Sequence, residues 1–517
     1  MIGSFYGRLP GGPVVKLLST TLVLAVLVTG GWFGFGLVFP ERDPSCAEGV
    51  EERGPAEECT GVTDGSYVFA PNLGDISARI KAENDFVDKQ TGGGKKVSAI
   101  SLAVVLPMAP AQQPERDKTL SQLRGVFLAQ YQANHGSNEK QPLIRLLLAN
   151  PGRGHEHWRP VADQLGEMTR SEERLRAVVG FDVSTRITQQ AIQYLTANLH
   201  IPVVGGPITA DDFGNSAQQP RRYPGLARVV PTTSGEAAAM AHLHAGVKPE
   251  DTLIIEDIRE GDNYVKSLRD AFQSLSQGSK RASEQYRAPD DYHEEGNTAV
   301  QFQQMVTSVC TSTARYLYFA GRPVQLRQFI NELGRRGCRE KTYTVISGSG
   351  ASTLVNDAKL DWTALEGENP ITVEYAAIAH PDAWSGAGAP RTGGSVAAYR
   401  EFEQLARSVL KLKRDDLIDS RAITMYDAGL TAVTSVRGTQ AGVPSTQQVA
   451  DGWLRLHGQY GKVNGASGWI CLDNYGNAYN KAVAVVRLDE KAPGRVRFVQ
   501  VAWPEGKATD KDCTAPR

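Results

Sequence analysis

The chain lacks an excess of charge of either sign. It carries 56 lysine and arginine residues against 57 aspartate and glutamate residues, for a formal net charge of −1. A protein that binds nucleic acid through its phosphates usually shows a basic excess, so the sequence gives no broad electrostatic case for a nucleic-acid partner. It also lacks the short internal repeat that predicts a solenoid or a propeller.

The common motifs of enzymes and metal sites are missing as well. The glycine-rich stretch Ser347–Ser352 has no P-loop lysine, and Gly465–Gly468 has the wrong spacing for a nucleophile elbow. No cysteine pair has C-x-x-C spacing. His155 and His157 flank Glu156 in a glycine-rich loop without an evident third ligand, and we interpret this as a surface loop. We therefore expect no catalytic residue, no metal and no cofactor.

Cysteine is scarce, with six residues in 517. Their presence fits an oxidising compartment outside the cytoplasm. Six cysteines allow fifteen pairings, and the sequence does not decide between them. Neighbourhood along the chain favours three disulfides, Cys46–Cys59, Cys310–Cys338 and Cys471–Cys513.

The stretch Leu17–Phe39 carries no charge and is long enough to cross a bilayer. Arg8 and Lys16 precede it and acidic residues follow, so the positive-inside rule places the N-terminus in the cytoplasm. We predict a cytoplasmic tail over 1–16, a single-pass transmembrane anchor over 17–39 and an extracellular main domain. The alternative is a cleaved signal peptide, but Gly34–Phe39 offers no small-x-small cleavage site.

Residues 40–96 are predicted to form an extracellular spacer with a short helix. Glu41–Ser66 is acidic and rich in glycine and proline, and Asp75–Lys89 has helical spacing of its apolar residues. The globular part starts at Val97. From there, short apolar strands alternate with amphipathic helices in two successive series, which predicts an α/β protein with two doubly wound, Rossmann-like lobes.

The stretch Arg176–Pro207 shows this pattern most clearly. A strand over Ala177–Gly180 is followed by a polar loop, a helix and a second strand, which together make a right-handed crossover of a parallel sheet. Ser184 and Thr185 then lie where a strand ends and a helix begins. Free N–H groups and the helix dipole favour an anion or a carbonyl oxygen there. The alternative is that both side chains only cap the helix.

Several segments share order and spacing with one protein superfamily. They are LRGVFLA (123–129), VVGFDVST (178–185), IPVVGGPIT (201–209), LARVVPTTSGEAAAMA (226–241), LIIEDIREGDNYVKSLRDAF (253–272), YFAGRPVQLRQFINELGRRG (318–337) and ITMYDAGLTAV (423–433). On these segments the chain resembles the type I periplasmic-binding-protein superfamily, and in particular the solute-binding receptors of branched-chain amino-acid and amide ABC transporters. The resemblance covers roughly Val97 to Trp503.

The resemblance implies two lobes joined by three crossovers, with a ligand in the cleft between them. We expect the crossovers near Val229–Thr232, Ile371–Glu374 and Gly461–Gly465. Lobe one would then comprise 97–231 and 371–462, lobe two 232–370 and 463–503, and residues 504–517 a C-terminal tail.

The resemblance also suggests ligand-binding residues. Ser184 and Thr185 match the loop that holds a ligand carboxylate, Thr209 follows the next strand, and Tyr264 matches an aromatic residue that covers the ligand. The alternative is that Tyr264 is an ordinary residue of a helix surface.

Two positions depart from the amino-acid-binding pattern. Arg322 replaces an aromatic residue, and Ser349 replaces a glutamate that receives the ligand's ammonium group. Both changes suit an anionic or neutral polar ligand better than a zwitterion, because a guanidinium can grip a carboxylate with two hydrogen bonds. The alternative is that Arg322 points to solvent and the cleft is degenerate.

The sequence thus predicts a membrane-anchored extracellular receptor that binds a small molecule and delivers it to an ABC permease. The alternative is a cell-surface interaction or regulatory protein that reuses the same fold without transport.

Overall fold

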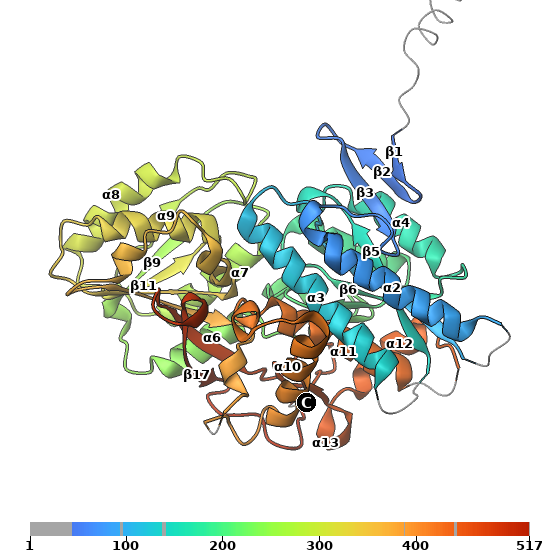
Figure 1. The fold of residues 1–517 in the computed structure, drawn as a ribbon. Helices are drawn as coiled ribbons and strands as arrows, with labels where there is room; N and C mark the ends of the chain where they lie inside the picture. The colour runs from blue at the N-terminus through green and yellow to red at the C-terminus, as the bar shows by residue number, and fades with distance from the viewer. Residues whose placement is uncertain (1–43, 94–96, 137–140, 387, 439–441, 516–517) are drawn as a thin grey trace, which may run out of the picture. The chain divides into compact units, whose positions relative to one another are not determined.

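The structure is a computed structural model that describes residues 44–93, 97–136, 141–386, 388–438 and 442–515. The predicted cytoplasmic tail and transmembrane anchor lie outside the described residues. Within the described ranges, no helix is both long and apolar enough to span a membrane. A short strand, β1 (Ser45–Ala47), opens the described chain, and residues 47–517 belong to one compact unit (Figure 1).

The first sheet of this unit runs, from β2 on, in the order β2-β3-β5-β4-β6-β7-β8. Strands β4 to β8 are parallel, whereas β2 and β3 are antiparallel to their neighbours. The strands are β2 (Val50–Arg53), β3 (Glu58–Thr63), β4 (Ala99–Val105), β5 (Leu143–Asn150), β6 (Leu175–Gly180), β7 (Val203–Gly205) and β8 (Leu226–Arg228).

Helices cover both faces of this sheet, which explains why its strands are nearly continuous runs of buried apolar residues. One group packs around β4 and β6 with Leu102, Val104 and Val179 in its core, and a second group packs on the other face around Ala103 and Val178. The helices of this part of the chain are α2 (Gly74–Thr91), α3 (Gln113–His135), α4 (Trp158–Met168), α5 (Arg186–Gln193), α10 (Val396–Leu410), α11 (Arg421–Arg437), α12 (Thr446–Gly452) and α13 (Gly458–Gly461).

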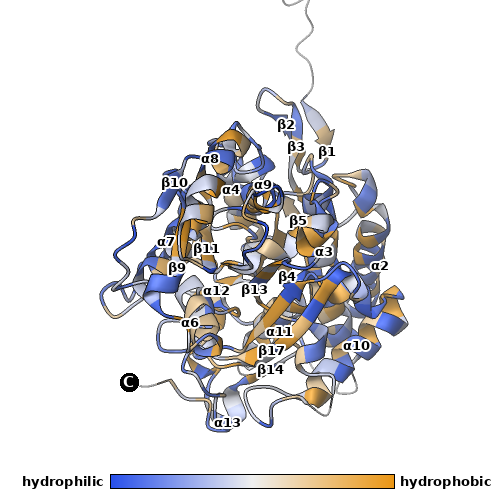
Figure 2. Ribbon diagram, turned by 90° about the vertical axis from the view of Figure 1, so that its left-hand side faces the viewer, coloured by the Kyte–Doolittle hydropathy of each residue, from blue (hydrophilic) through white to orange (hydrophobic). Residues whose placement is uncertain are grey.

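The second sheet has the order β10-β9-β11-β12-β13-β16-β17. Its first five strands are parallel, and the hairpin β16–β17 adds two antiparallel strands. The strands are β9 (Thr252–Asp257), β10 (Glu284–Tyr286), β11 (Tyr316–Ala320), β12 (Tyr343–Ser347), β13 (Ile371–Ala377), β16 (Val483–Leu488) and β17 (Val496–Ala502), and the helices are α6 (Thr233–Leu243), α7 (Asn263–Leu275), α8 (Thr298–Thr311) and α9 (Pro323–Gly334). Hydrophobic residues gather on the strands and on the helix faces turned toward them (Figure 2).

The mixed α/β class with parallel sheets in two lobes is confirmed, but two lobe boundaries were wrong. The strand at 371–377 is β13, which pairs with β12 in the second sheet, so the chain returns to lobe one only after it. The short hairpin of β14 (Val463–Gly465) and β15 (Gly468–Ile470) packs with the core of lobe one, and the last crossover therefore precedes β16. The sequence of an apolar strand does not show which of the two sheets the strand joins, so these boundaries could not be predicted from the sequence.

The prediction of a spacer over 40–96 was also wrong. β3 pairs with β5 through Gly61–Asn150 and adjoining residues, and α2 buries Ile76 and Ile80 in the core of lobe one. The expected short helix is present as α2, but it is part of the lobe. The acidic, glycine-rich composition of this segment reflects the turns of a small hairpin rather than a linker.

All six cysteines are disulfide-bonded, and none is free. Two of the favoured pairs are present, Cys310–Cys338, which joins α8 to the segment after α9, and Cys471–Cys513, which ties the C-terminal segment to lobe one. Residues 504–515 are therefore held by this bond and by backbone contacts such as that between the Gly458 N–H and the Cys513 carbonyl oxygen, 3.0 Å apart.

We expect the double variant Cys310→Ser/Cys338→Ser to fold with a lower stability. The bond closes a loop with a sequence separation of 28 residues. Without such a cross-link the unfolded chain gains entropy, which lowers its free energy by about 3–4 kcal/mol at 25 °C. Denaturant unfolding of the wild type and the variant measures this difference. An unchanged unfolding midpoint would show that the bond does not constrain the unfolded state.

Candidate functional site

Five of the six predicted ligand-binding residues line one buried cavity between the two lobes. Ser184 and Thr209 follow β6 and β7 of the first sheet, and Tyr264, Arg322 and Ser349 follow β9, β11 and β12 of the second. All five are at least nine-tenths buried. The carboxyl ends of both parallel sheets thus converge here, as expected for ligand sites of open α/β sheets.

The cavity is small. Its volume is about 50 Å³, room for a few water molecules and much less than the ~300–1,000 Å³ of a typical small-molecule site. Residues that the sequence did not suggest also line it, namely Lys118, Asp182, Tyr292, Thr353 and Arg421. The cavity is therefore polar, and it carries charged groups from both lobes.

Direct hydrogen bonds join the lobes beside the cavity. The Tyr264 N–H donates to the Ser184 carbonyl oxygen at 3.1 Å, and the Arg186 N–H donates to the Gly261 carbonyl oxygen at 3.1 Å. Farther along, the Asn263 side chain donates to the Asp212 carboxylate at 2.7 Å. The loop after β6 and the start of α7 are thus in direct contact.

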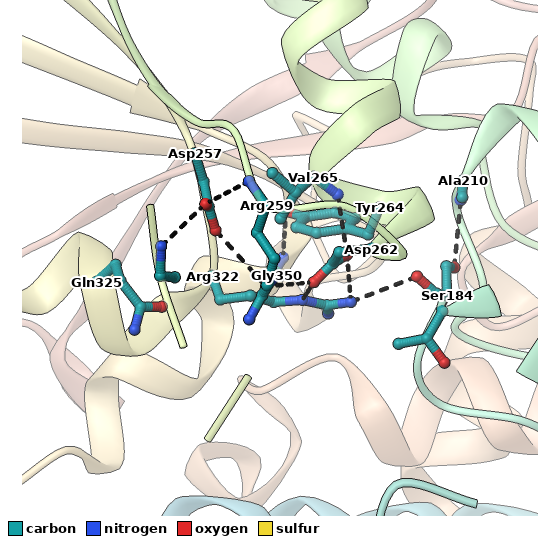
Figure 3. Close-up of polar contacts among 12 residues, drawn as sticks. Ser184, Ala210, Asp257, Arg259, Asp262, Tyr264, Val265, Arg322, Gln325 and Gly350 are labelled. Atoms are coloured by element: carbon teal, nitrogen blue, oxygen red, sulfur yellow. Dashed lines mark hydrogen bonds and ion pairs between the residues drawn. The ribbon is translucent and has the colours of Figure 1, made fainter. Parts of the chain in front are cut away.

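Arg322 does not point to solvent, but its guanidinium group is already hydrogen-bonded to a carboxylate of the protein. Its Nε and Nη2 atoms donate to the two carboxylate oxygens of Asp262 at 2.7 and 2.8 Å, and Nη2 also lies 3.4 Å from the Ser184 carbonyl oxygen (Figure 3). Asp262 also accepts from Arg259 at 2.6 Å. Burial disfavours the charge of Arg322, but Asp262 outweighs this effect and raises the pKa of the guanidinium. The carboxylate that Arg322 binds is therefore one of the protein's own.

Two tyrosine rings lie against the guanidinium group of Arg322. Its guanidinium lies 4.9 Å from the ring centre of Tyr264 and 5.1 Å from that of Tyr292, in cation–π contact with both. The Tyr264 hydroxyl accepts a hydrogen bond from the Gly350 N–H at 3.0 Å. Tyr264 is thus no residue of a helix surface: it is buried and fixes the loop after β12.

A second charged group lies on the side of lobe one. Lys118 forms ion pairs with Glu115 and, at 2.8 Å, with Asp182. Burial works against all three charges, but the pairing outweighs it, lowers the pKa of both carboxyls and raises that of Lys118. Sequence analysis missed Lys118 because nothing distinguishes it from other helix lysines, whereas Asp182 stands beside Ser184 in the polar loop.

The interpretation of His155 as part of a surface loop was wrong. Its side chain is fully buried, stacks on Phe181 and lies 3.9 Å from Asp182. Burial lowers the pKa of His155 to about 4, so the imidazole is neutral at physiological pH. Within the described residues, no group of three metal-ligating side chains lies at the cleft.

Thr185 is separated from the other predicted residues. Its hydroxyl caps α5 by accepting from the Thr188 N–H at 3.4 Å. It lines a different, outer hollow of about 780 Å³ that the β2–β3 turn and the loops after β5, β9 and β10 surround. Capping is therefore the role that the geometry gives to Thr185.

Ser349 connects the cavity with a buried acid on α6. Its N–H donates to a carboxylate oxygen of Glu236 at 3.0 Å, and the other oxygen of Glu236 has no partner among the described residues. Burial raises the pKa of Glu236 to about 8, although the hydrogen bond from Ser349 opposes this shift. The carboxyl group is consequently protonated at neutral pH.

Several solved structures share this fold. A leucine-binding protein LivK from Thermotoga maritima matches with a TM-score of 0.56 at 18% identity, over 78% of this chain and 99% of that protein. The substrate-binding protein LivJ from Streptococcus pneumoniae, solved with isoleucine, matches with a TM-score of 0.56 at 15% identity, over 79% and 100%. The chain has the type I periplasmic-binding-protein fold.

A solute-binding protein of this fold from R. palustris, solved with 4-hydroxybenzoate, matches with a TM-score of 0.55 at 13% identity, over 80% of this chain and 98% of that protein. No protein-family model and no curated protein sequence matches the chain. The type I binding-protein fold is thus established by structure, at sequence identities that leave the ligand open.

The buried acid Glu236 predicts a pH dependence of stability. Its pKa is raised in the folded protein, so the unfolded chain binds fewer protons between about pH 4.5 and 8, and the free energy of unfolding falls as the pH rises through this window. Glu236→Gln keeps an oxygen acceptor for Ser349 and should remove this contribution, on the order of 3–5 kcal/mol at pH 8. Urea unfolding of both proteins at pH 5 and pH 8 measures it; parallel pH profiles would contradict the assignment.

Proposed function

We propose that this protein is a membrane-anchored extracellular receptor that binds a small polar or anionic solute between its lobes and delivers it to an ABC importer. The observation that carries the proposal is the convergence of Ser184, Thr209, Tyr264, Arg322 and Ser349, from five strand ends of two sheets, on one buried cavity. The solved proteins that share the fold are named as solute-binding or transporter proteins.

The way the chain connects the two lobes is suited to binding a solute by hinge closure. Three crossovers join the lobes, after β8, after β13 and before β16, and the cavity lies between the two sheets they connect. A solute larger than a few water molecules requires the lobes to part at contacts such as Tyr264–Ser184. Closure around the solute would then present the face that a permease recognises.

A second function has one observation in its favour. The small cavity and the internal pairing of Arg322 with Asp262 fit a protein that keeps the fold but binds no solute. Such a protein would act as a cell-surface interaction or regulatory protein without transport. A solute that occupies the cavity distinguishes the two functions.

The cavity predicts which substitutions reduce binding. We expect mass spectrometry of the purified full chain to find a small molecule whose occupancy falls at least tenfold in Ser184→Ala and in Tyr264→Phe. Ser184 supplies a hydroxyl to the cavity, and the Tyr264 hydroxyl fixes the loop at Gly350.

Thr185→Ala is the matched control, because it alters the adjacent residue but caps a helix outside the cavity. It should keep the occupancy while losing about 1 kcal/mol of stability. Equal occupancy in all four proteins would remove the cavity from the proposed function, and an empty wild type would favour the interaction protein.

The anchor is proposed from residues 17–39 alone, an uncharged stretch flanked by positive residues on its N-terminal side. The full chain should remain in the membrane pellet after alkaline carbonate extraction, with the main domain open to protease added outside the cell. Deletion of residues 1–40 behind a cleavable export signal should release it. Recovery of the full chain in the soluble fraction, with a new N-terminus near residue 40, would show a cleaved signal peptide instead.

A further inference from the structure

Arg421, the first residue of α11, contributes a buried guanidinium to the cavity. Close helix packing fixes its position: a Cβ added at Gly125 of α3 would come within 2.1 Å of the Ala422 carbonyl oxygen. Glycine at 125 therefore lets the start of α11 approach α3. The side chain of Arg421 extends from lobe one to lobe two and is 5% exposed.

Among the described residues, no side-chain hydrogen bond of Arg421 reaches a carboxylate, and its charge acts on the buried carboxylates of Asp182 and Asp419 only without direct contact, where it favours their charged forms. Nη2 donates to the Ser352 hydroxyl at 2.9 Å and lies 3.4 Å from the Ser349 carbonyl oxygen, and Nε is buried without a partner. In the described part of the chain, no carboxylate forms an ion pair with this guanidinium. Asp419 accepts from the backbone N–H of Arg421 at 2.9 Å and also from the side chain of Ser121.

The two other cationic side chains that line the cavity differ from Arg421 because each forms an ion pair with a carboxylate. Lys118 has Glu115 and Asp182 as counter-ions, and Arg322 has Asp262. The nearby acid Glu236 is held in its neutral form by burial, which raises its pKa to about 8. A buried charge without a directly bonded counter-ion is costly, so an anion that enters the cavity would be stabilised most strongly at Arg421.

Hydroxyl donors line the same cavity. Ser184 accepts from the Ala210 N–H at 3.4 Å, and Thr209 accepts from the Thr233 hydroxyl at 3.2 Å. Each of these hydroxyls keeps its own hydrogen for donation to a ligand. A guanidinium and two hydroxyl donors form a set that recognises an oxyanion.

We propose that Arg421, rather than Arg322, is the residue that binds the ligand's anionic group, and that the ligand is a small organic carboxylate. The proposal rests on the proposed function, and it names the chemical class of the solute. Arg322 then serves as a structural pair with Asp262 inside lobe two, beside the loop after β6 of lobe one. Inorganic phosphate offers the same oxyanion chemistry and is distinguished by experiment.

The test compares carboxylates with their neutral amides. Acetate and acetamide, 4-hydroxybenzoate and 4-hydroxybenzamide, and inorganic phosphate are titrated against the full chain by thermal shift and calorimetry. We expect at least one of the two carboxylates to bind at least tenfold more tightly than its amide and more tightly than phosphate. Arg421→Gln should weaken carboxylate binding at least tenfold without changing amide binding, and Arg421→Lys, which keeps the charge, should lose less.

Arg437→Gln is the matched control. Arg437 lies at the other end of α11, and among the described residues its guanidinium donates to backbone carbonyl oxygens, so this variant should bind the carboxylate as the wild type does. The proposal is overturned if neither carboxylate binds, if carboxylate and amide bind with equal affinity, or if phosphate binds more tightly. It is also overturned if the wild type and Arg421→Gln bind the carboxylate equally, or if Arg421→Gln and Arg421→Lys lose the same affinity.

The two proposals fail in different ways. A neutral solute that co-purifies with the wild type and with Arg421→Gln to the same extent refutes the anion site and leaves the receptor function intact. Absence of any bound or co-purified small molecule in the wild type refutes both.

Discussion

The doubly hydrogen-bonded ion pair between Arg322 and Asp262 lies where the two lobes meet, and the arrangement of the cleft depends on it. Both groups are buried, so neither charge is tolerated without the other. Asp262 also caps α7 and binds Arg259, while Arg322 contacts Tyr264, Tyr292 and the loop after β6. One pair thus holds several residues of lobe two in place and contacts lobe one at the Ser184 carbonyl oxygen.

Pairing of charges then distinguishes the cations of the cavity. Lys118 and Arg322 each have carboxylate partners within the protein, whereas the side chain of Arg421 donates to a hydroxyl and a carbonyl oxygen and to no carboxylate of the described residues. The guanidinium that resembles a ligand contact in the sequence is paired with a carboxylate of the protein, and one that resembles an ordinary helix residue also lines the cavity. The ionic partners of each side chain therefore say more about its role than its place in a sequence pattern does.

The fold and the function rest on different kinds of support. Solved structures at 13–18% identity share the architecture over nearly their whole length, and this establishes the type I binding-protein fold. The cavity of about 50 Å³ and the direct contacts between the lobes concern this chain alone. They support either a receptor for a small solute or a protein that has retained the fold for another purpose.

The sequence by itself determined the alternation of strands and helices, the two lobes and five residues of the cavity. Local patterns decide these features: apolar runs make buried strands, and polar residues at strand ends lie at the cleft because the sheets are parallel. The tertiary structure alone decided that β13 joins the second sheet, that β3 extends the first, and that Thr185 lies outside the cavity. It alone also paired Arg322 with Asp262, which is 60 residues away, and left the side chain of Arg421 without a carboxylate partner in the part of the chain that the structure describes. Contacts between distant segments fix those features, and no local pattern in a single sequence records them.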